Sequence, residues 1–137
     1  MVGKFLAILF CVVYNATISF KEKTMQYRTY NVKADLPTVE LALANIEIEI
    51  ETCKSEGVRM LKVIHGYGSS GVGGEIKHAL NNWLKIKKRQ GLFLDYVKGE
   101  ELATSKKQKK FKEICPELMG DFELYFSNPG VTLIFIS

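Results

Sequence analysis

The sequence has few of the residues on which disulfide-stabilised, zinc-binding or proline-rich proteins depend. Its 137 residues include three cysteines, three prolines and two histidines. The cysteines, Cys11, Cys53 and Cys115, form no CxxC pair, so they argue against a disulfide scaffold or a structural zinc site and favour the reducing cytoplasm. A GxxxxGK[ST] sequence is also missing, and ATP hydrolysis by a P-loop is therefore not expected.

No apolar run is long enough to cross a membrane. The longest, Phe5–Tyr14, falls short of the roughly 20 residues that a spanning helix needs, although it has the size of a signal-peptide core. Three interpretations of residues 1–24 stay open: an over-extended reading frame that truly starts at Met25, a signal peptide, or a membrane anchor. The codons of Lys21-Glu22 can form a purine-rich ribosome-binding sequence before Met25. We expect one domain over residues 25–137, without stable membrane association.

The composition is that of a globular protein, with 47% hydrophobic and 25% charged residues and a mean hydropathy of zero. The net charge is +4, and it is unevenly distributed. Residues 77–112 hold eleven Lys or Arg against three acids, whereas residues 36–56 hold five Glu against Lys54. This asymmetry predicts either a field that attracts an anionic partner or two ordinary solvated helix faces.

The first half of the chain predicts a strand, a helix and a second strand. Residues 27–34 alternate and are rich in Tyr and Val, which favours a strand. Residues 46–51 also alternate, but apolar side chains from Val39 to Cys53 recur at spacings of four and three, which predicts a helix. Thr38 is a suitable N-cap and Gly57 a suitable end, so we predict a helix here. The apolar residues 58–64 then predict a buried strand.

The second half predicts a helix over residues 75–90, with Ile76, Leu80 and Trp83 on its apolar face, and a strand over residues 92–97. A short basic helix is expected before Pro116, and residues 131–136 predict a closing strand. Strand–helix–strand–helix–strand order predicts an α/β fold, a compact βαβαβ sandwich with a four-stranded mixed sheet.

A glycine-rich turn follows the second strand and precedes the second helix, with the sequence His65-Gly66-Tyr67-Gly68-Ser69-Ser70-Gly71. Glycines let the backbone approach a ligand closely, and amides before a helix favour an anion such as phosphate. The same residues spell GxGxxG, with Asp95 in the place of a ribose-binding acid, so a nucleotide or dinucleotide binder is an alternative. A tight turn without a ligand is a further interpretation.

The segment from His65 to Gly71 resembles the HGxGxG signature of Smr (small MutS-related) domains, with one additional serine. Residues 128–134 resemble the family's closing glycine, threonine and apolar strand, and residues 37–40 resemble the start of its first helix. The resemblance covers roughly residues 30–136 and is carried by three segments in matching order. It implies a compact α/β sandwich related to the C-terminal domain of a translation initiation factor.

The resemblance also implies DNA or RNA as partner, since members bind nucleic acid and several cleave it. The family's LDLH or LDLR segment at the end of the first strand is implicated in cleavage, and this chain retains only Asp35-Leu36 of it. We therefore keep two hypotheses open, a nucleic-acid-binding domain with endonuclease activity and a non-catalytic binding module. Cofactors and oligomeric state are left undetermined, except that cleavage would call for a divalent cation.

The candidate catalytic residues are His65, which titrates in a useful range, and Asp35, which could orient it or hold a cation. Their alternative roles are a structural histidine at a strand end and an acid near a helix N-terminus. Phosphate contacts are predicted for the glycine turn and for basic side chains. The candidate nucleic-acid-binding residues are Gly66, Tyr67, Gly68, Ser69, Ser70, Gly71, Lys77, Lys88, Arg89, Lys106, Lys107, Lys109 and Lys110.

Overall fold

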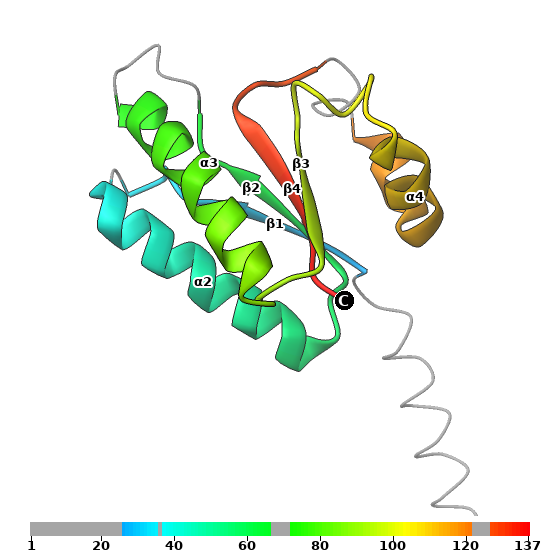
Figure 1. Ribbon diagram of the computed structural model, residues 1–137, viewed down its shortest axis with the longest axis horizontal. Helices are drawn as coiled ribbons and strands as arrows, with labels where there is room; N and C mark the ends of the chain where they lie inside the picture. The colour runs from blue at the N-terminus through cyan, green and yellow to red at the C-terminus, as the bar shows by residue number, and fades with distance from the viewer. Residues whose placement is uncertain (1–25, 36, 67–71, 122–126) are drawn as a thin grey trace, which may run out of the picture.

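The computed structural model describes residues 26–35, 37–66, 72–121 and 127–137 (Figure 1). In chain order its elements are β1 (Tyr27–Asn31), α2 (Val39–Glu56), β2 (Met60–Ile64), α3 (Val72–Arg89), β3 (Asp95–Lys98), α4 (Lys107–Ile114), the short 3₁₀ helix η1 (Pro116–Gly120) and β4 (Val131–Phe135). The predicted α/β class and mixed four-stranded sheet are confirmed. Residues 1–25, and with them the three interpretations of the N-terminal segment, lie outside the described residues.

Helix α2 forms where the apolar spacing predicted it, despite the alternating Ile-Glu pattern. Thr38 caps its first turn by accepting a hydrogen bond from the backbone N–H of Leu41, and Gly57 ends it with φ 74°. Ile46, Ile50 and Cys53 are fully buried on the inner side. The helical period therefore prevails over the period of two, because only a helix buries this stripe against one face of the sheet.

The sheet has the strand order β1-β2-β4-β3. β1 pairs with β2 in parallel, while β4 runs antiparallel to both β2 and β3. The parallel connection uses α2 as its crossover, as a parallel pair requires. β2 and β4 are central and almost wholly buried, whereas β1 and β3 are the edges.

Side chains from the two sheet faces form two cores. Leu61, Val63 and Ile134 pack with α2 and α3 on one face. Met60, Leu133 and Phe135 pack with α4 and η1 on the other face. The alternation within β2 and β4 is the period of two expected for strands that are covered on both sides. Figure 1 shows α2 and α3 together on one side of the sheet and α4 on the opposite side.

Several boundaries differ from the predicted ones. β1 ends at Asn31 because the chain turns over residues 32–35, and α3 begins at Val72, inside the glycine run. β3 begins at Asp95 rather than at Leu92, because the chain still bends over residues 92–94, although Phe93 is already buried in the core. Trp83 is half-buried against the same core, as its helical position predicted.

Within the ranges that the structure describes, no helix is both long and apolar enough to cross a membrane.

Candidate functional site

One end of the sheet gathers the segments that the sequence singled out. The residues after β1, after β2 and after β3 lie at this end, and so do the residues that precede β4, because β4 runs antiparallel to its two neighbours. The N-terminus of α3 follows the glycine turn at the same end (Figure 1). The topology therefore places His65 beside the start of β4.

His65 is the centre of this end and is only 1% exposed. Its ring Nδ1 lies 2.7 Å from the carbonyl oxygen of Gly66, and its Nε2 lies 2.9 Å from Oγ1 of Thr132 on β4. Its backbone N–H donates to the carbonyl of Gly130 at 2.9 Å. His65 therefore joins the end of β2 to the start of β4.

These partners determine the tautomer of His65. The Gly66 carbonyl can only accept, so Nδ1 carries the proton, and Nε2 of the neutral ring accepts from the hydroxyl of Thr132. Burial lowers the pKa of His65, and Lys77 lowers it further, although the bond to Gly66 acts in the opposite direction. The ring is therefore neutral near pH 7, with both nitrogens occupied.

Gly66 begins the glycine turn with a positive φ of 73°, a backbone conformation that glycine adopts without steric cost. Its N–H donates to the Gly130 carbonyl at 3.0 Å, the oxygen that also accepts from His65. The remaining predicted turn residues, Tyr67, Gly68, Ser69, Ser70 and Gly71, lie outside the described residues.

Asp35 does not end the first strand. It is exposed in the turn between β1 and α2, three residues before the Thr38 cap. Neither ring nitrogen of His65 bonds to it, since both have other partners. The predicted catalytic role of Asp35 stays a prediction, and its location agrees with the alternative of an acid near a helix start.

Lys77 of α3 is near His65 and pairs with Glu100, which follows β3, at 3.1 Å. Gly99 supports this turn, because a Cβ built there would come within 2.3 Å of the Asn128 carbonyl oxygen. The segment after β3 is thus packed closely against the residues that lead into β4.

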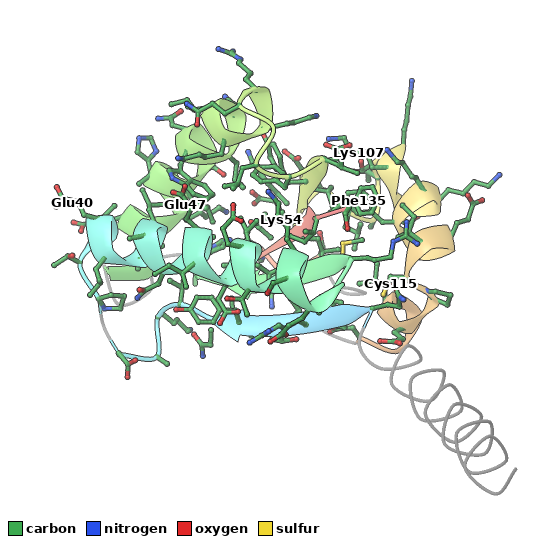
Figure 2. All side chains as sticks on the ribbon, turned by 90° about the horizontal axis from the view of Figure 1, so that it is seen from below. Glu40, Glu47, Lys54, Lys107, Cys115 and Phe135 are labelled. Carbon is green, nitrogen blue, oxygen red and sulfur yellow. The ribbon has the colours of Figure 1, made fainter. Side chains whose placement is uncertain are left out.

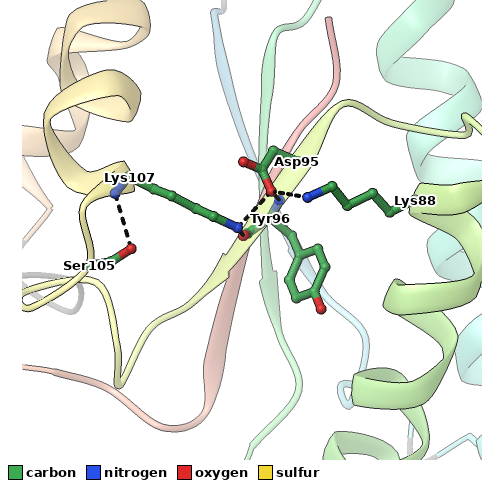
Figure 3. Close-up of polar contacts among 5 residues, drawn as sticks. All are labelled: Lys88, Asp95, Tyr96, Ser105 and Lys107. Atoms are coloured by element: carbon green, nitrogen blue, oxygen red, sulfur yellow. Dashed lines mark hydrogen bonds and ion pairs between the residues drawn. The ribbon is translucent and has the colours of Figure 1, made fainter.

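The other predicted cations are divided between α3 and α4. Lys88 and Lys107 both bind one carboxylate oxygen of Asp95, at 2.9 and 2.7 Å (Figure 3). The side chains of Arg89, Lys106, Lys109 and Lys110 are exposed. The sequence therefore identified these basic residues, but the structure separates them from the His65 end and gathers two of them at Asp95.

Three contact residues were not predicted. The sequence places Thr132 within the segment that resembles the family's closing strand, suggests Asp95 only as a ribose-binding acid, and indicates no role for Glu100. Thr132 is 67 positions away from His65, and no local pattern links the two. A threonine within the otherwise apolar closing strand is the sequence signal that could have suggested a polar partner.

In this arrangement His65 has no free lone pair for acid–base chemistry. A general base needs an accessible lone pair near the reacting proton, and the only one on His65 already accepts from Thr132. Across residues 26–35, 37–66, 72–121 and 127–137, no three His, Cys, Asp or Glu side chains gather closely enough to hold a metal ion. His65 and Gly66 thus tie the end of β2 to the start of β4.

Comparison with known proteins gave three results. The crystal structure of the Smr domain of Thermus thermophilus MutS2 aligns with 80% of this chain and 98% of that chain, at 17% identity and a TM-score of 0.49. No curated protein matched. The model of the Smr domain family matches residues 36–106, just over half of the chain, and this range holds α2, β2, α3, β3 and the glycine turn. The chain therefore belongs to the Smr domain family.

Proposed function

We propose that this Smr domain binds nucleic acid through its phosphate backbone. The observation that carries the proposal is a surplus of basic side chains along α3 and α4. Six of them form no ion pair with any residue in the described ranges: Lys85, Arg89, Lys106, Lys109, Lys110 and Lys112. Cations that are not neutralised within the protein attract an anionic polymer, and they release its counterions on binding.

The acidic helix α2 supports an oriented interaction. Glu40 and Glu47 lie along α2, on the other side of the sheet from Lys107 of α4 (Figure 2). An acidic face opposite a basic face repels a polyanion from one side and attracts it to the other. Nucleic acid would therefore approach the α4 side and the adjoining end of α3.

The frame around His65 supports a second contact. Because His65 and Gly66 share the Gly130 carbonyl, the start of the glycine turn is tied to the segment before β4, at the end of the two central strands. In our proposal the turn offers backbone amides to a phosphate, as its sequence predicts, and Tyr67 stacks on an unpaired base. Ser69 and Ser70 add hydroxyl donors.

Of the two hypotheses drawn from the sequence, the non-catalytic binding module is the better supported. His65 is buried with both nitrogens occupied, Asp35 is exposed and not bonded to it, and the LDLH segment is incomplete. Endonuclease activity would require a rearrangement that opens His65 Nε2 or a catalytic group elsewhere. It is the alternative outcome of the test below.

The test is fluorescence anisotropy with labelled single-stranded DNA, duplex DNA and RNA of one sequence, using the full chain. We expect log affinity to fall linearly with log salt concentration, by roughly 0.7–0.9 for each phosphate neutralised. Flat salt dependence, or absence of binding, would overturn the proposal. Incubation with Mg²⁺ or Mn²⁺ tests cleavage in parallel, and cleavage abolished by Asp35→Asn would establish the endonuclease alternative.

Tyr67→Ala tests the glycine turn separately, with Tyr30→Ala on β1 as a control aromatic that is half-buried at the sheet edge. We expect Tyr67→Ala to weaken single-stranded binding by about 1–3 kcal/mol, the usual contribution of base stacking. Equal weakening by both substitutions would attribute the effect to folding rather than to stacking.

A further inference from the structure

A cluster of four cations surrounds one row of the sheet, at the position where Asp95 of β3 pairs with Phe135 of β4. Asp95 Oδ1 accepts from Lys88 Nζ at 2.9 Å, from Lys107 Nζ at 2.7 Å and from the backbone N–H of Tyr96 at 2.8 Å (Figure 3). Lys88 comes from the end of α3 and Lys107 from the start of α4. The carboxylate therefore brings together two lysines from helices on opposite faces of the sheet.

The other two cations lie over the ring of Phe135. The Lys110 ammonium is 5.6 Å and the Arg59 guanidinium 5.8 Å from the ring centroid, on the face of the sheet that α4 covers. Figure 2 shows Lys107 and Phe135 on this same side. The row thus carries four positive groups and one side-chain carboxylate, that of Asp95. Arg59 Nε also donates to a terminal oxygen of Ser137 at 3.0 Å, which offsets part of the charge of Arg59 but not that of the three lysines.

The excess of positive charge in this row favours the binding of an anion. Two ammonium groups that share one oxygen lie at most about 5.6 Å apart, and a single carboxylate neutralises only one of them. Their side chains remain 42% and 39% exposed, whereas the Asp95 side chain beneath them is 12% exposed. A phosphate oxygen that approaches from solvent therefore meets two ammonium groups before it meets the carboxylate.

The row is separate from the glycine turn. Ile64, which precedes His65, pairs with Val131, whereas Asp95 pairs with Phe135, four residues further along β4. At about 3.3 Å per residue, the two places lie roughly 13 Å apart along this strand. Successive phosphates of one strand can span such a distance.

We propose that Lys88, Lys107, Lys110 and Arg59 form a second phosphate-binding surface, which holds the backbone of nucleic acid across the β3 edge. This inference rests on the proposed function and assigns Asp95 as a positioning residue, because it fixes the two lysines without contacting the ligand. Binding here is sequence-independent, since only phosphate charge is recognised.

The experiment compares the full chain with K88Q/K107Q in the anisotropy assay over a series of salt concentrations. Two lost phosphate contacts make the slope of log affinity against log salt shallower by roughly 1.4–1.8, which corresponds to about 25- to 60-fold weaker binding at 0.1 M salt. The matched control is K54Q/K87Q, which changes the net charge equally but alters lysines that pair with Glu51 and Glu47 of α2. K88R/K107R keeps both charges and should retain binding.

Thermal unfolding of each variant separates folding from binding. The proposed phosphate-binding surface is supported if K88Q/K107Q binds more weakly and with a shallower slope. The control K54Q/K87Q and the arginine variant must then bind like the wild-type chain. If the wild-type chain binds but K88Q/K107Q keeps its slope, the lysines only tie α3 and α4 to the sheet and this inference is overturned, while the proposed function stands. If the wild-type chain binds no oligonucleotide, both fall. If K88Q/K107Q is too unstable to assay, K110Q takes its place, because it leaves both ion pairs of Asp95 intact. K110Q should make the slope of log affinity against log salt shallower by roughly 0.7–0.9, the equivalent of one phosphate contact.

Discussion

Replacing Thr132 by valine removes one hydroxyl from a buried pair while nearly keeping the shape of the side chain. Thr132 is 2% exposed and His65 1% exposed, and the hydroxyl is the partner of His65 Nε2 at 2.9 Å. In Thr132→Val, Nε2 has lost its donor, and water cannot replace it without opening the core. The Nδ1 bond to Gly66 stays, so the ring keeps its orientation.

Two opposing effects determine the magnitude. A buried acceptor left without a partner costs about 1–3 kcal/mol. The methyl group that replaces the hydroxyl gains apolar burial of about 0.8 kcal/mol. We therefore expect Thr132→Val to lower the free energy of unfolding by about 0.2–2 kcal/mol, whose upper part is a large share of the stability of a small domain.

Urea unfolding of the full chain measures this loss, provided that the m-value is unchanged between variants. A double-mutant cycle with His65→Phe isolates the contribution of the pair from the cost of each substitution. Thr104→Val, in an exposed turn, is the control and should change stability by less than about 0.5 kcal/mol.

A coupling energy near zero between positions 65 and 132 would refute this reasoning. It would mean that Nε2 finds another donor or that His65 is not held as the tautomer we assign. Nitrogen NMR of the imidazole gives an independent answer, because the assigned tautomer carries its proton on Nδ1 at pH 7.

Three further predictions follow from the buried contacts. Because the pKa of His65 is lowered in the folded chain, its unfolded form binds more protons, so stability is fully present above about pH 6.5 and is lost as the pH falls below that value. Gly99→Ala should lower the free energy of unfolding by roughly 4 kcal/mol or more, because the new Cβ would lie 2.3 Å from the Asn128 carbonyl oxygen and the backbone would have to move. Asp121→Ala should cost about 1–3 kcal/mol in denaturant unfolding, since it removes an acceptor from buried Lys62 and from the hydroxyl of Tyr27.

Each of these has a control. His65→Phe should lose the acid-dependent part of the stability curve below about pH 6.5, and an unchanged curve would contradict the assignment. Gly120→Ala meets no atom within 4 Å and should be tolerated, unlike Gly99→Ala. Asp121→Asn retains an acceptor for Tyr27, which donates to Asp121 Oδ2 at 2.6 Å, and should cost less than alanine. Equal losses for alanine and asparagine would show that the charge dominates.

The sequence by itself determined the elements whose signals are local. The spacing of Val39, Ile46 and Cys53 predicted α2, and Thr38 and Gly57 predicted its ends. The α/β order and the mixed sheet followed from the succession of strands and helices, and the glycine turn was identified from seven consecutive residues. These features depend on neighbours within a few positions along the chain, which is why a pattern reveals them.

Only the tertiary structure decided which distant residues meet. His65 and Thr132 come together because β4 returns antiparallel beside β2, and this pairing is what makes the histidine buried and neutral. Asp95 joins lysines from α3 and α4 because β3 lies at the sheet edge between the two layers. Contacts across strands and layers are fixed by topology and packing, so the sequence named the basic residues and the histidine but not their partners.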